Sequence, residues 1–221
     1  MIEHINGIDI NYEKTGSGRP LVMIHGNGED HTIFDESVEI LKDSFTCYCL
    51  DSRGHGASTK VPVLHYTDMA EDVVRFIEKH DLNDVIFYGF SDGGIIGLIA
   101  AAKCPRITKL IVSGANITPR GAKLWIRVVI NAKNIVKKDP MLELMIKEPH
   151  ISDDMLKSIR ADTLVLAGSR DLIREGETRH IARCIPKSEL KILKGETHGS
   201  YIEHNEKIGH IILEFAAGQN K

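Results

Sequence analysis

The sequence predicts an α/β fold, in which a mostly parallel β-sheet carries helices on both faces. Short, nearly unbroken apolar runs, such as residues 21–24 and 85–88, alternate along the chain with amphipathic segments such as 67–80. Apolar runs of this length are typical of strands buried on both faces of a parallel sheet. Glycine-rich loops follow several of these runs, and ligands of such sheets bind beyond the carboxyl ends of the strands.

The chain opens with a predicted hairpin around Asn6-Gly7, a dipeptide that favours tight turns between antiparallel strands. Leu21–Ile24 is the first buried strand, and it ends at the loop His25–Gly28. Phe45–Leu50 is the next strand, and it leads into the loop Asp51–Ser58, whose glycines and small residues suit a tight surface loop.

A helix is expected over Thr67–His80, because its apolar residues recur at helical spacing. Val85–Tyr88 then forms a buried strand, which leads through a glycine-rich turn into the apolar segment Ile95–Ala102. Strand and helix alternate to the end of the chain, with strands expected at 109–113, 163–167 and 189–193 and helices near 175–184 and 203–217.

About 45 residues separate the strand ending near Ser113 from the one starting near Thr163, which is too long for an ordinary connection. We interpret residues 116–160 as a helical cap inserted into a single domain that spans residues 1–221. Apolar residues within 120–138 recur at helical spacing among basic ones, which predicts a basic amphipathic helix or helix pair. Nine Lys or Arg and five Asp or Glu occupy residues 120–160. The cap is either a lid with its charges in solvent or a surface that attracts anionic substrates or lipid.

Composition narrows the class of protein. A net charge of −3 and a pI near 6.4 argue against a nucleic-acid partner, because proteins that bind the anionic phosphate backbone usually carry an excess of basic residues. The longest apolar run, residues 95–102, is far shorter than the roughly 20 residues of a membrane-spanning helix, so no stable membrane insertion is expected. The N-terminus lacks the basic and apolar regions of a secretion signal. The cysteines lack paired C-x-x-C spacing, which predicts buried, reduced thiols and a cytoplasmic protein: Cys47, Cys49, Cys104 and Cys184.

Three loops carry residues suited to nucleophilic catalysis. Gly89-Phe-Ser91-Asp-Gly93 is a G-x-S-x-G sequence between a predicted strand and a predicted helix, where a sharp turn can expose the serine hydroxyl. A serine needs a base to take its proton and an acid to orient that base. Asp171 follows the strand at 163–167, and His198 follows the last strand, so both should reach the edge that holds Ser91. The catalytic residues predicted are therefore Ser91, Asp171 and His198.

With these motifs, the chain resembles the α/β-hydrolase family over essentially its whole length apart from the cap. The loop His25–Gly28 is similar to the family's H-G-x-G oxyanion loop, and the loops at Asp51–Ser58, Asp171 and His198 also resemble family loops. The resemblance implies an eight-stranded sheet and an oxyanion hole formed by the backbone N–H groups of Asn27 and Asp92. For the substrate pocket within the cap, we name Trp125 and Met141.

The function expected is a serine hydrolase that cleaves a small ester or thioester through an acyl-enzyme. A serine nucleophile disfavours the family's dehalogenase and epoxide hydrolase branches, which the resemblance associates with aspartate. Carbon–carbon bond hydrolase, lysophospholipase and aminopeptidase activities stay open. An aminopeptidase would need a carboxylate for the substrate amine, and Glu143 and Glu148 lie in the cap. A different class, a hydrolase-fold protein that binds a small ligand, also stays open.

No cofactor is expected, because the glycine-rich loops match neither the P-loop nor the dinucleotide-binding pattern. His198, His204 and His210 lie six residues apart, a spacing that does not align them on one helix face, so no metal site is expected. The partner expected is a small-molecule acyl substrate. The oligomeric state is left open, a homo-oligomer included.

Overall fold

A computed structural model describes residues 1–218 of the protein. Its centre is an eight-stranded sheet with the strand order β1-β2-β4-β3-β5-β6-β7-β8. β2 pairs antiparallel with both β1 and β4, and all other neighbours are parallel, which confirms the predicted mostly parallel sheet. The strands are β1 (Ile2–Ile5), β2 (Ile8–Gly16), β3 (Arg19–Ile24), β4 (Phe45–Leu50), β5 (Val85–Phe90), β6 (Ile107–Ser113), β7 (Asp162–Gly168) and β8 (Ser188–Leu193).

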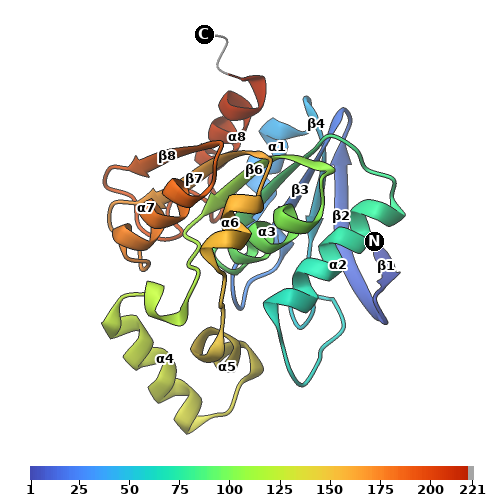
Figure 1. Ribbon diagram of the computed structural model, residues 1–221. Coiled ribbons are helices and arrows are strands. Elements are labelled where there is room, and N and C mark those ends of the chain that lie inside the picture. The colour runs from blue at the N-terminus through green and yellow to red at the C-terminus, as the bar shows by residue number, and fades with distance from the viewer. Residues whose placement is uncertain (219–221) are drawn as a thin grey trace.

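Helices cover both faces of this sheet (Figure 1). The α-helices are α1 (Asp35–Leu41), α2 (Tyr66–Lys79), α3 (Asp92–Lys103), α4 (Leu124–Val136), α5 (Pro140–Lys147), α6 (Asp153–Ser158), α7 (Glu175–Cys184) and α8 (Lys207–Ala217). Two short 3₁₀ helices, η1 (His31–Phe34) and η2 (Pro119–Gly121), complete the elements. One hydrophobic core lies under α2, α3, α6 and α7, and a second lies under α1 and α8.

Local sequence explains most of the element boundaries. Asn6 and Gly7 both have positive φ angles, 52° and 78°, as a tight hairpin turn requires, so the predicted turn is confirmed. The last helix starts at Lys207 rather than near residue 203, because turns occupy residues 200–204. Helix α1 was not predicted, since its seven residues are too few to show a clear helical period.

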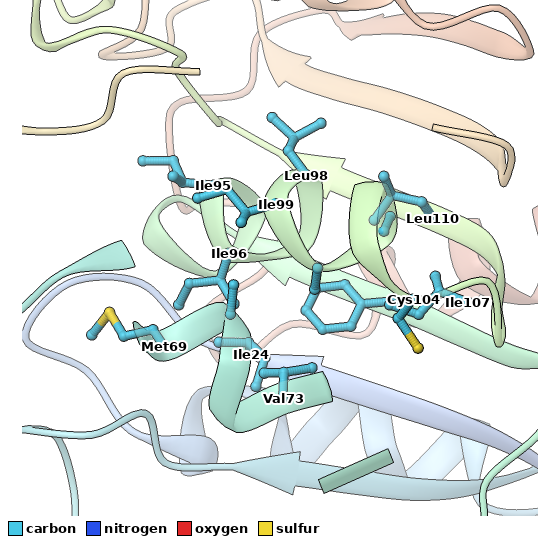
Figure 2. Packing of buried hydrophobic residues seen from close by; sticks show 14 of the residues in the cluster. Ile24, Met69, Val73, Ile95, Ile96, Leu98, Ile99, Cys104, Ile107 and Leu110 are labelled. Carbon is cyan, nitrogen blue, oxygen red and sulfur yellow. The ribbon is translucent and has the colours of Figure 1, made fainter. Parts of the chain in front are cut away.

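Helix α3 is buried around nearly its whole circumference and forms the middle of the larger core. Figure 2 shows Ile96 of α3 lying toward Met69 and Val73 of α2, with Ile24 of β3 beneath. Close packing on all sides leaves the helix little freedom to shift. The residue that precedes α3, Ser91, is therefore held in a fixed position.

The segment 116–160 between β6 and β7, which we term the insertion, contains η2, α4, α5 and α6. Figure 1 shows α4 and α5 projecting from the end of the sheet, whereas α6 lies back against the body. Leu144 of α5 and Leu156 of α6 are buried and join the larger core. Of the helices within residues 1–218, none combines the length and apolar character that crossing a bilayer requires.

The cysteines are free, as predicted, although they are not equally buried. Cys47, Cys49 and Cys104 are buried, whereas Cys184 is half-buried at the end of α7. Burial raises the pKa of the Cys47 thiol to about 12. A thiol with so high a pKa carries little of the reactive thiolate form at neutral pH.

Candidate active site

Ser91 stands at a sharp turn between β5 and α3. Its φ of 53° and ψ of −112° are unusual for a residue with a side chain. The turn needs glycines on both sides of the serine. A Cβ on Gly89 would lie 2.1 Å from the Gly93 carbonyl oxygen, and a Cβ on Gly93 would lie 2.1 Å from that of Ile24. The G-x-S-x-G spacing therefore reflects close backbone contacts that only glycine permits.

The structure brings Ser91, His198 and Asp171 together although they lie in three separate loops. The Ser91 Oγ is 3.0 Å from the His198 Nε2, and the His198 Nδ1 is 2.6 Å from the Asp171 Oδ1. In this arrangement the imidazole donates from Nδ1 to the carboxylate and accepts at Nε2 from the serine hydroxyl. The geometry is that of a nucleophile, a base and an orienting acid.

Asp171 is buried, and its two carboxylate oxygens are fixed by the surrounding backbone. Oδ1 accepts from the Ile173 N–H at 2.9 Å, and Oδ2 accepts from the Gly168 N–H at 3.3 Å. Burial favours the neutral carboxyl, but the hydrogen bond and charge of His198, with these N–H groups, outweigh it and lower the pKa of Asp171. The carboxylate is therefore ionised where it meets the imidazole.

Gly114 makes room for the histidine, and sequence reasoning did not identify it. Its φ is 64°, and a Cβ at this position would lie 2.6 Å from the His198 Cε1. The Phe90 ring lies on another side of the imidazole, with the ring centres 5.0 Å apart. The His198 ring is thus confined between β6 and β5. A lone glycine after a strand gives no specific signal for such a role in the sequence.

The backbone N–H groups of Asn27 and Asp92, expected to form an oxyanion hole, belong to the β3 loop and the first turn of α3. Neither N–H donates a hydrogen bond to any acceptor within residues 1–218. The N–H of Gly93 instead donates to the His25 carbonyl at 3.1 Å, which ties the two segments together. Two free N–H groups on fixed segments near Ser91 could donate hydrogen bonds to an oxygen on which negative charge develops.

His25 lies beneath the β3 loop and fixes its conformation. Its Nδ1 donates to the Gly26 carbonyl at 2.7 Å, and its Nε2 accepts from the Ser52 N–H at 3.1 Å. Burial lowers the pKa of His25 to about 4, so the imidazole is neutral at physiological pH. Glu29 completes the loop by accepting from the Gly26 N–H at 2.8 Å, and burial raises the pKa of Glu29 to about 7.

The side chain of Asp92 forms a buried polar cluster next to Ser91. Its carboxylate accepts from the Tyr66 hydroxyl at 2.8 Å and from the Asn27 Nδ2 at 2.9 Å. Both donors are neutral, and no ion pair within residues 1–218 includes Asp92. Burial raises the pKa of the Asp92 carboxyl despite these two hydrogen bonds. Glu148 lies beside the cluster, and its Oε2 accepts from the Tyr66 N–H at 3.1 Å.

A cavity of about 260 Å³ opens above Ser91 and His198. The insertion supplies its apolar wall through side chains of α4 and α5, which are Ile126, Ile130, Met145 and Ile146. Leu172 and Ile173 line it from the loop after β7, and Asp92 and Glu148 also reach it. Arg127 and Asn131 of α4 line it as well, so the cavity combines a polar floor with a wall that is apolar except for these two side chains.

Trp125 and Met141, named from the sequence as pocket residues, do not line this cavity. Trp125 is 56% exposed on the outer side of α4, because one residue turns a helix by about 100° and Ile126 takes the inner position. Met141 packs half-buried against the core, and its carbonyl accepts from the Asn27 Nδ2 at 3.2 Å. The i, i+4 spacing of Ile126 and Ile130 is the sequence signal that could have identified the inner face.

Two groups of side chains have the composition of metal ligands, and both lie outside the cavity. One consists of Asp153, His180 and Cys184, and the other of Asp30, His31 and Asp51. In the second group the Asp51 carboxylate accepts from the backbone N–H groups of His31 and Ala57. The residues beside Ser91 are thus not part of either group.

The chain belongs to the α/β-hydrolase fold family. A sequence profile described as "alpha/beta hydrolase fold" matches residues 19–140, which is more than half of the chain. The mouse protein "Serine hydrolase BPHL" is 23% identical over 244 residues, covering 96% of this chain and 84% of its own. The human protein of the same name is 36% identical over 122 residues, covering 51% of this chain and 41% of its own.

Solved structures share the fold over nearly the full chain. An esterase from Exiguobacterium antarcticum superposes with a TM-score of 0.83 at 22% identity, covering 99% of both chains. A meta-cleavage product hydrolase from Pseudomonas fluorescens IP01 gives a TM-score of 0.81 at 17% identity, covering 100% of this chain and 98% of its own. An esterase and a meta-cleavage product hydrolase share this scaffold, so the fold alone does not define the reaction.

Proposed function

We propose that the protein is a serine hydrolase that cleaves small esters or thioesters through an acyl-enzyme. The observation that carries the proposal is the continuous hydrogen-bonded series Ser91–His198–Asp171, with distances of 3.0 and 2.6 Å, at the floor of an apolar cavity. Membership of the α/β-hydrolase fold family supports it.

In the proposed reaction, the Ser91 Oγ attacks the acyl carbonyl carbon while its proton moves to the His198 Nε2. The N–H groups of Asn27 and Asp92 stabilise the resulting oxyanion. His198 then returns the proton to the leaving alkoxide or thiolate, and the acyl group stays on Ser91. A water molecule, deprotonated by His198, attacks the acyl carbonyl carbon, the bond to the Ser91 Oγ breaks, and His198 returns the proton to Oγ as the carboxylic acid leaves. Asp171 holds the imidazole tautomer in both halves.

The size of the cavity supports a small acyl group. Its volume of about 260 Å³ lies slightly below the range of about 300–1,000 Å³ that is usual for ligand pockets. The apolar side chains Ile126 and Ile130 would contact the acyl chain, because they belong to the wall that faces Ser91. The insertion thus acts as the lid that limits acyl length.

Two experiments test this function. A fluorophosphonate probe should label the wild-type protein, and Ser91→Ala, with folding checked by circular dichroism, should abolish labelling. Absence of Ser91-dependent labelling would favour the small-ligand binding protein instead. Nitrophenyl esters of increasing acyl length should show the highest kcat/KM at short chains. A rising kcat/KM toward long chains would contradict the preference for small substrates.

A second candidate is an acyl substrate that carries an amine near the scissile carbonyl. The buried Asp92 carboxylate supports it, since this carboxylate lines the cavity with only neutral hydrogen-bond donors around it. Glu148, which also lines the cavity, is a second acidic group, and its Oε1 lies 2.6 Å from the His65 Nδ1. Glu143, the other carboxylate considered from the sequence, is not among the lining residues and instead pairs with Lys147 at 2.9 Å. Arg127 also lines the cavity, but no ion pair within residues 1–218 joins it to Asp92, so a substrate ammonium group would be the counter-charge of this carboxylate.

Aminoacyl and plain acyl nitrophenyl esters of equal length distinguish the two candidates. Recognition of the amine predicts a higher kcat/KM for the aminoacyl ester and loss of that advantage in Asp92→Asn, which keeps the backbone N–H. An equal kcat/KM for the two esters in the wild-type protein would reject the amine-bearing substrate while leaving ester hydrolysis intact.

A further inference from the structure

Helix α4 is apolar on two sides, and only one of them faces the protein. The inner side carries Ile126 and Ile130, which line the cavity, and Asn134, which is buried. The outer side carries large hydrophobic side chains in solvent, with Leu124 70%, Ile135 81% and Val136 88% exposed. A helix that is apolar all round is normally covered on all sides, so the outer face of α4 lacks a partner.

The outer side forms one continuous stripe. Nine large hydrophobic side chains are exposed within residues 1–218, and six of them lie on α4. They form three adjacent pairs that begin at residues 124, 128 and 135, and steps of four and seven residues place the pairs along one face of the helix. We name this set the outer stripe: Leu124, Trp125, Val128, Val129, Ile135 and Val136. Scattered exposed hydrophobic residues are ordinary, but a cluster of this kind marks a contact surface.

The charged residues around the outer stripe are all basic. Residues 120–138 contain no Asp or Glu and six basic residues, which are Arg120, Lys123, Arg127, Lys133, Lys137 and Lys138. Arg127 lines the cavity, so the other five are the ones available to the outer stripe. None of these six takes part in an ion pair within residues 1–218. An apolar stripe bordered by unpaired cations complements a surface that is apolar within and anionic at its boundary.

We propose that α4 docks the protein onto anionic lipid bilayers, with the outer stripe buried at the level of the headgroups and the basic residues on lipid phosphates. A helix of 13 residues is too short to span a bilayer and therefore lies in the plane of the interface. A second copy of the chain is disfavoured as the occupant, because two such basic faces would repel each other. The proposal depends on the outer side of α4 and makes no use of the hydrolase reaction.

Docking through α4 also orients the molecule. The outer stripe and the cavity wall are opposite sides of one helix, so the bilayer would lie next to the lid of the cavity. Figure 1 shows that α4 and α5 project beyond the body, and no other element of the described chain stands between α4 and solvent in that view. The rest of the protein can therefore stay in water while α4 meets the interface.

Trp125 is the only tryptophan in the chain, and it belongs to the outer stripe, so intrinsic fluorescence reports docking directly. On adding vesicles of phosphatidylcholine with 30–40% phosphatidylserine (about one lipid in three), we expect a blue shift of Trp125 emission and quenching by brominated acyl chains. Pure phosphatidylcholine vesicles should bind far less, and salt should weaken binding to the anionic ones. Unchanged emission with anionic vesicles would overturn the proposal.

Variants separate the two parts of the surface. Each basic residue near an anionic bilayer contributes about fivefold in partitioning, so Lys137→Ala/Lys138→Ala should weaken vesicle binding about 25-fold. Lys103→Ala/Lys194→Ala, which removes two exposed lysines elsewhere, is the matched control and should bind as wild type. Equal weakening by both pairs would show general charge attraction and reject α4 docking.

The apolar part is tested by Val128→Ser against Val63→Ser, since these valines are equally exposed at 59% and 60%. Only Val128→Ser should weaken binding, by about tenfold. A Trp125 blue shift that grows with protein concentration without vesicles, together with dimer formation in analytical ultracentrifugation, would assign the stripe to a second copy and overturn lipid docking.

Discussion

Gly93, two residues after Ser91, lies against the end of β3, so that a Cβ on it would be 2.1 Å from the Ile24 carbonyl oxygen. Its N–H donates to the neighbouring His25 carbonyl at 3.1 Å. The turn that carries Ser91 is thereby joined to the loop that carries the Asn27 N–H. The position of Ser91 relative to the Asn27 N–H depends on this contact. In the proposed reaction this position matters, because the pre-set geometry of hydrogen-bond donors determines how well they stabilise a developing charge.

Gly93→Ala should therefore destabilise the protein by about 1–3 kcal/mol, since a backbone carbonyl cannot move aside as a flexible side chain could. Urea denaturation measures the free energy of unfolding. Gly176→Ala is the control: this glycine lies in α7 with nothing within 4 Å of an added Cβ, and its replacement should stabilise by about 0.5–1 kcal/mol. Equal effects of the two substitutions would contradict the role of the Gly93 contact.

Asp171→Asn should lower kcat on a short nitrophenyl ester about 10⁴-fold with the fold retained. The asparagine keeps the shape of the side chain but no longer selects the imidazole tautomer that accepts the Ser91 proton. Stopped assays at several ester concentrations separate kcat from KM. Asp154→Asn, whose side chain is 93% exposed, serves as the control and should leave kcat unchanged. A loss below tenfold in Asp171→Asn would argue against Asp171 as the orienting acid.

Glu29 should make stability fall as pH rises. Its pKa is about 7 in the folded protein against 4.5 for an ordinary Glu, because burial favours the neutral carboxyl. The folded state thus holds the proton more tightly. The resulting stability is complete below about pH 4.5, declines as pH rises through about 7, and is absent above that.

Glu29→Gln is neutral at every pH and removes this dependence. The variant should match the wild type at pH 4.5 and exceed its free energy of unfolding by about 1–3 kcal/mol at pH 8, allowing for partial exposure of Glu29. Guanidinium denaturation of both proteins at the two pH values tests this. A difference that is the same at both, or that reverses in sign, would refute the titration of Glu29.

The ion pair between Arg53 and Asp72 should be important for stability. Both side chains are nearly buried, the Arg53 Nε lies 2.6 Å from the Asp72 Oδ2, and Asn6 donates to the same carboxylate at 3.0 Å. Asp72→Ala leaves a buried guanidinium without this partner and should cost about 3–5 kcal/mol. Asp68→Ala, which removes a carboxylate 3.6 Å from Arg53 and about half exposed, should cost at most about 1 kcal/mol. Thermal unfolding of both variants provides the comparison.

The sequence identified those parts of the site that depend on residues close together in the chain. The residues Ser91, Asp171 and His198 each follow a buried strand, and the carboxyl ends of parallel strands meet at one edge, so their proximity followed from order alone. The hairpin at Asn6-Gly7 was predictable for a similar reason, because its geometry depends on two adjacent residues. Helix α1 could not be predicted, because its seven residues are too few to show a helical repeat of apolar positions.

Tertiary structure alone decided the features that depend on distant segments. Trp125 is a predicted pocket residue because it lies in the cap, yet the rotation of α4 against the body turns it outward and turns Ile126 inward. Gly114 and Tyr66 gained their positions beside His198 and Asp92 only through folding. The sequence by itself thus determined which strands Ser91, Asp171 and His198 follow, and hence that the three side chains meet at one edge of the sheet. The rotation of each helix and the lining of the cavity depended on packing between elements far apart in the chain, which no local pattern encodes.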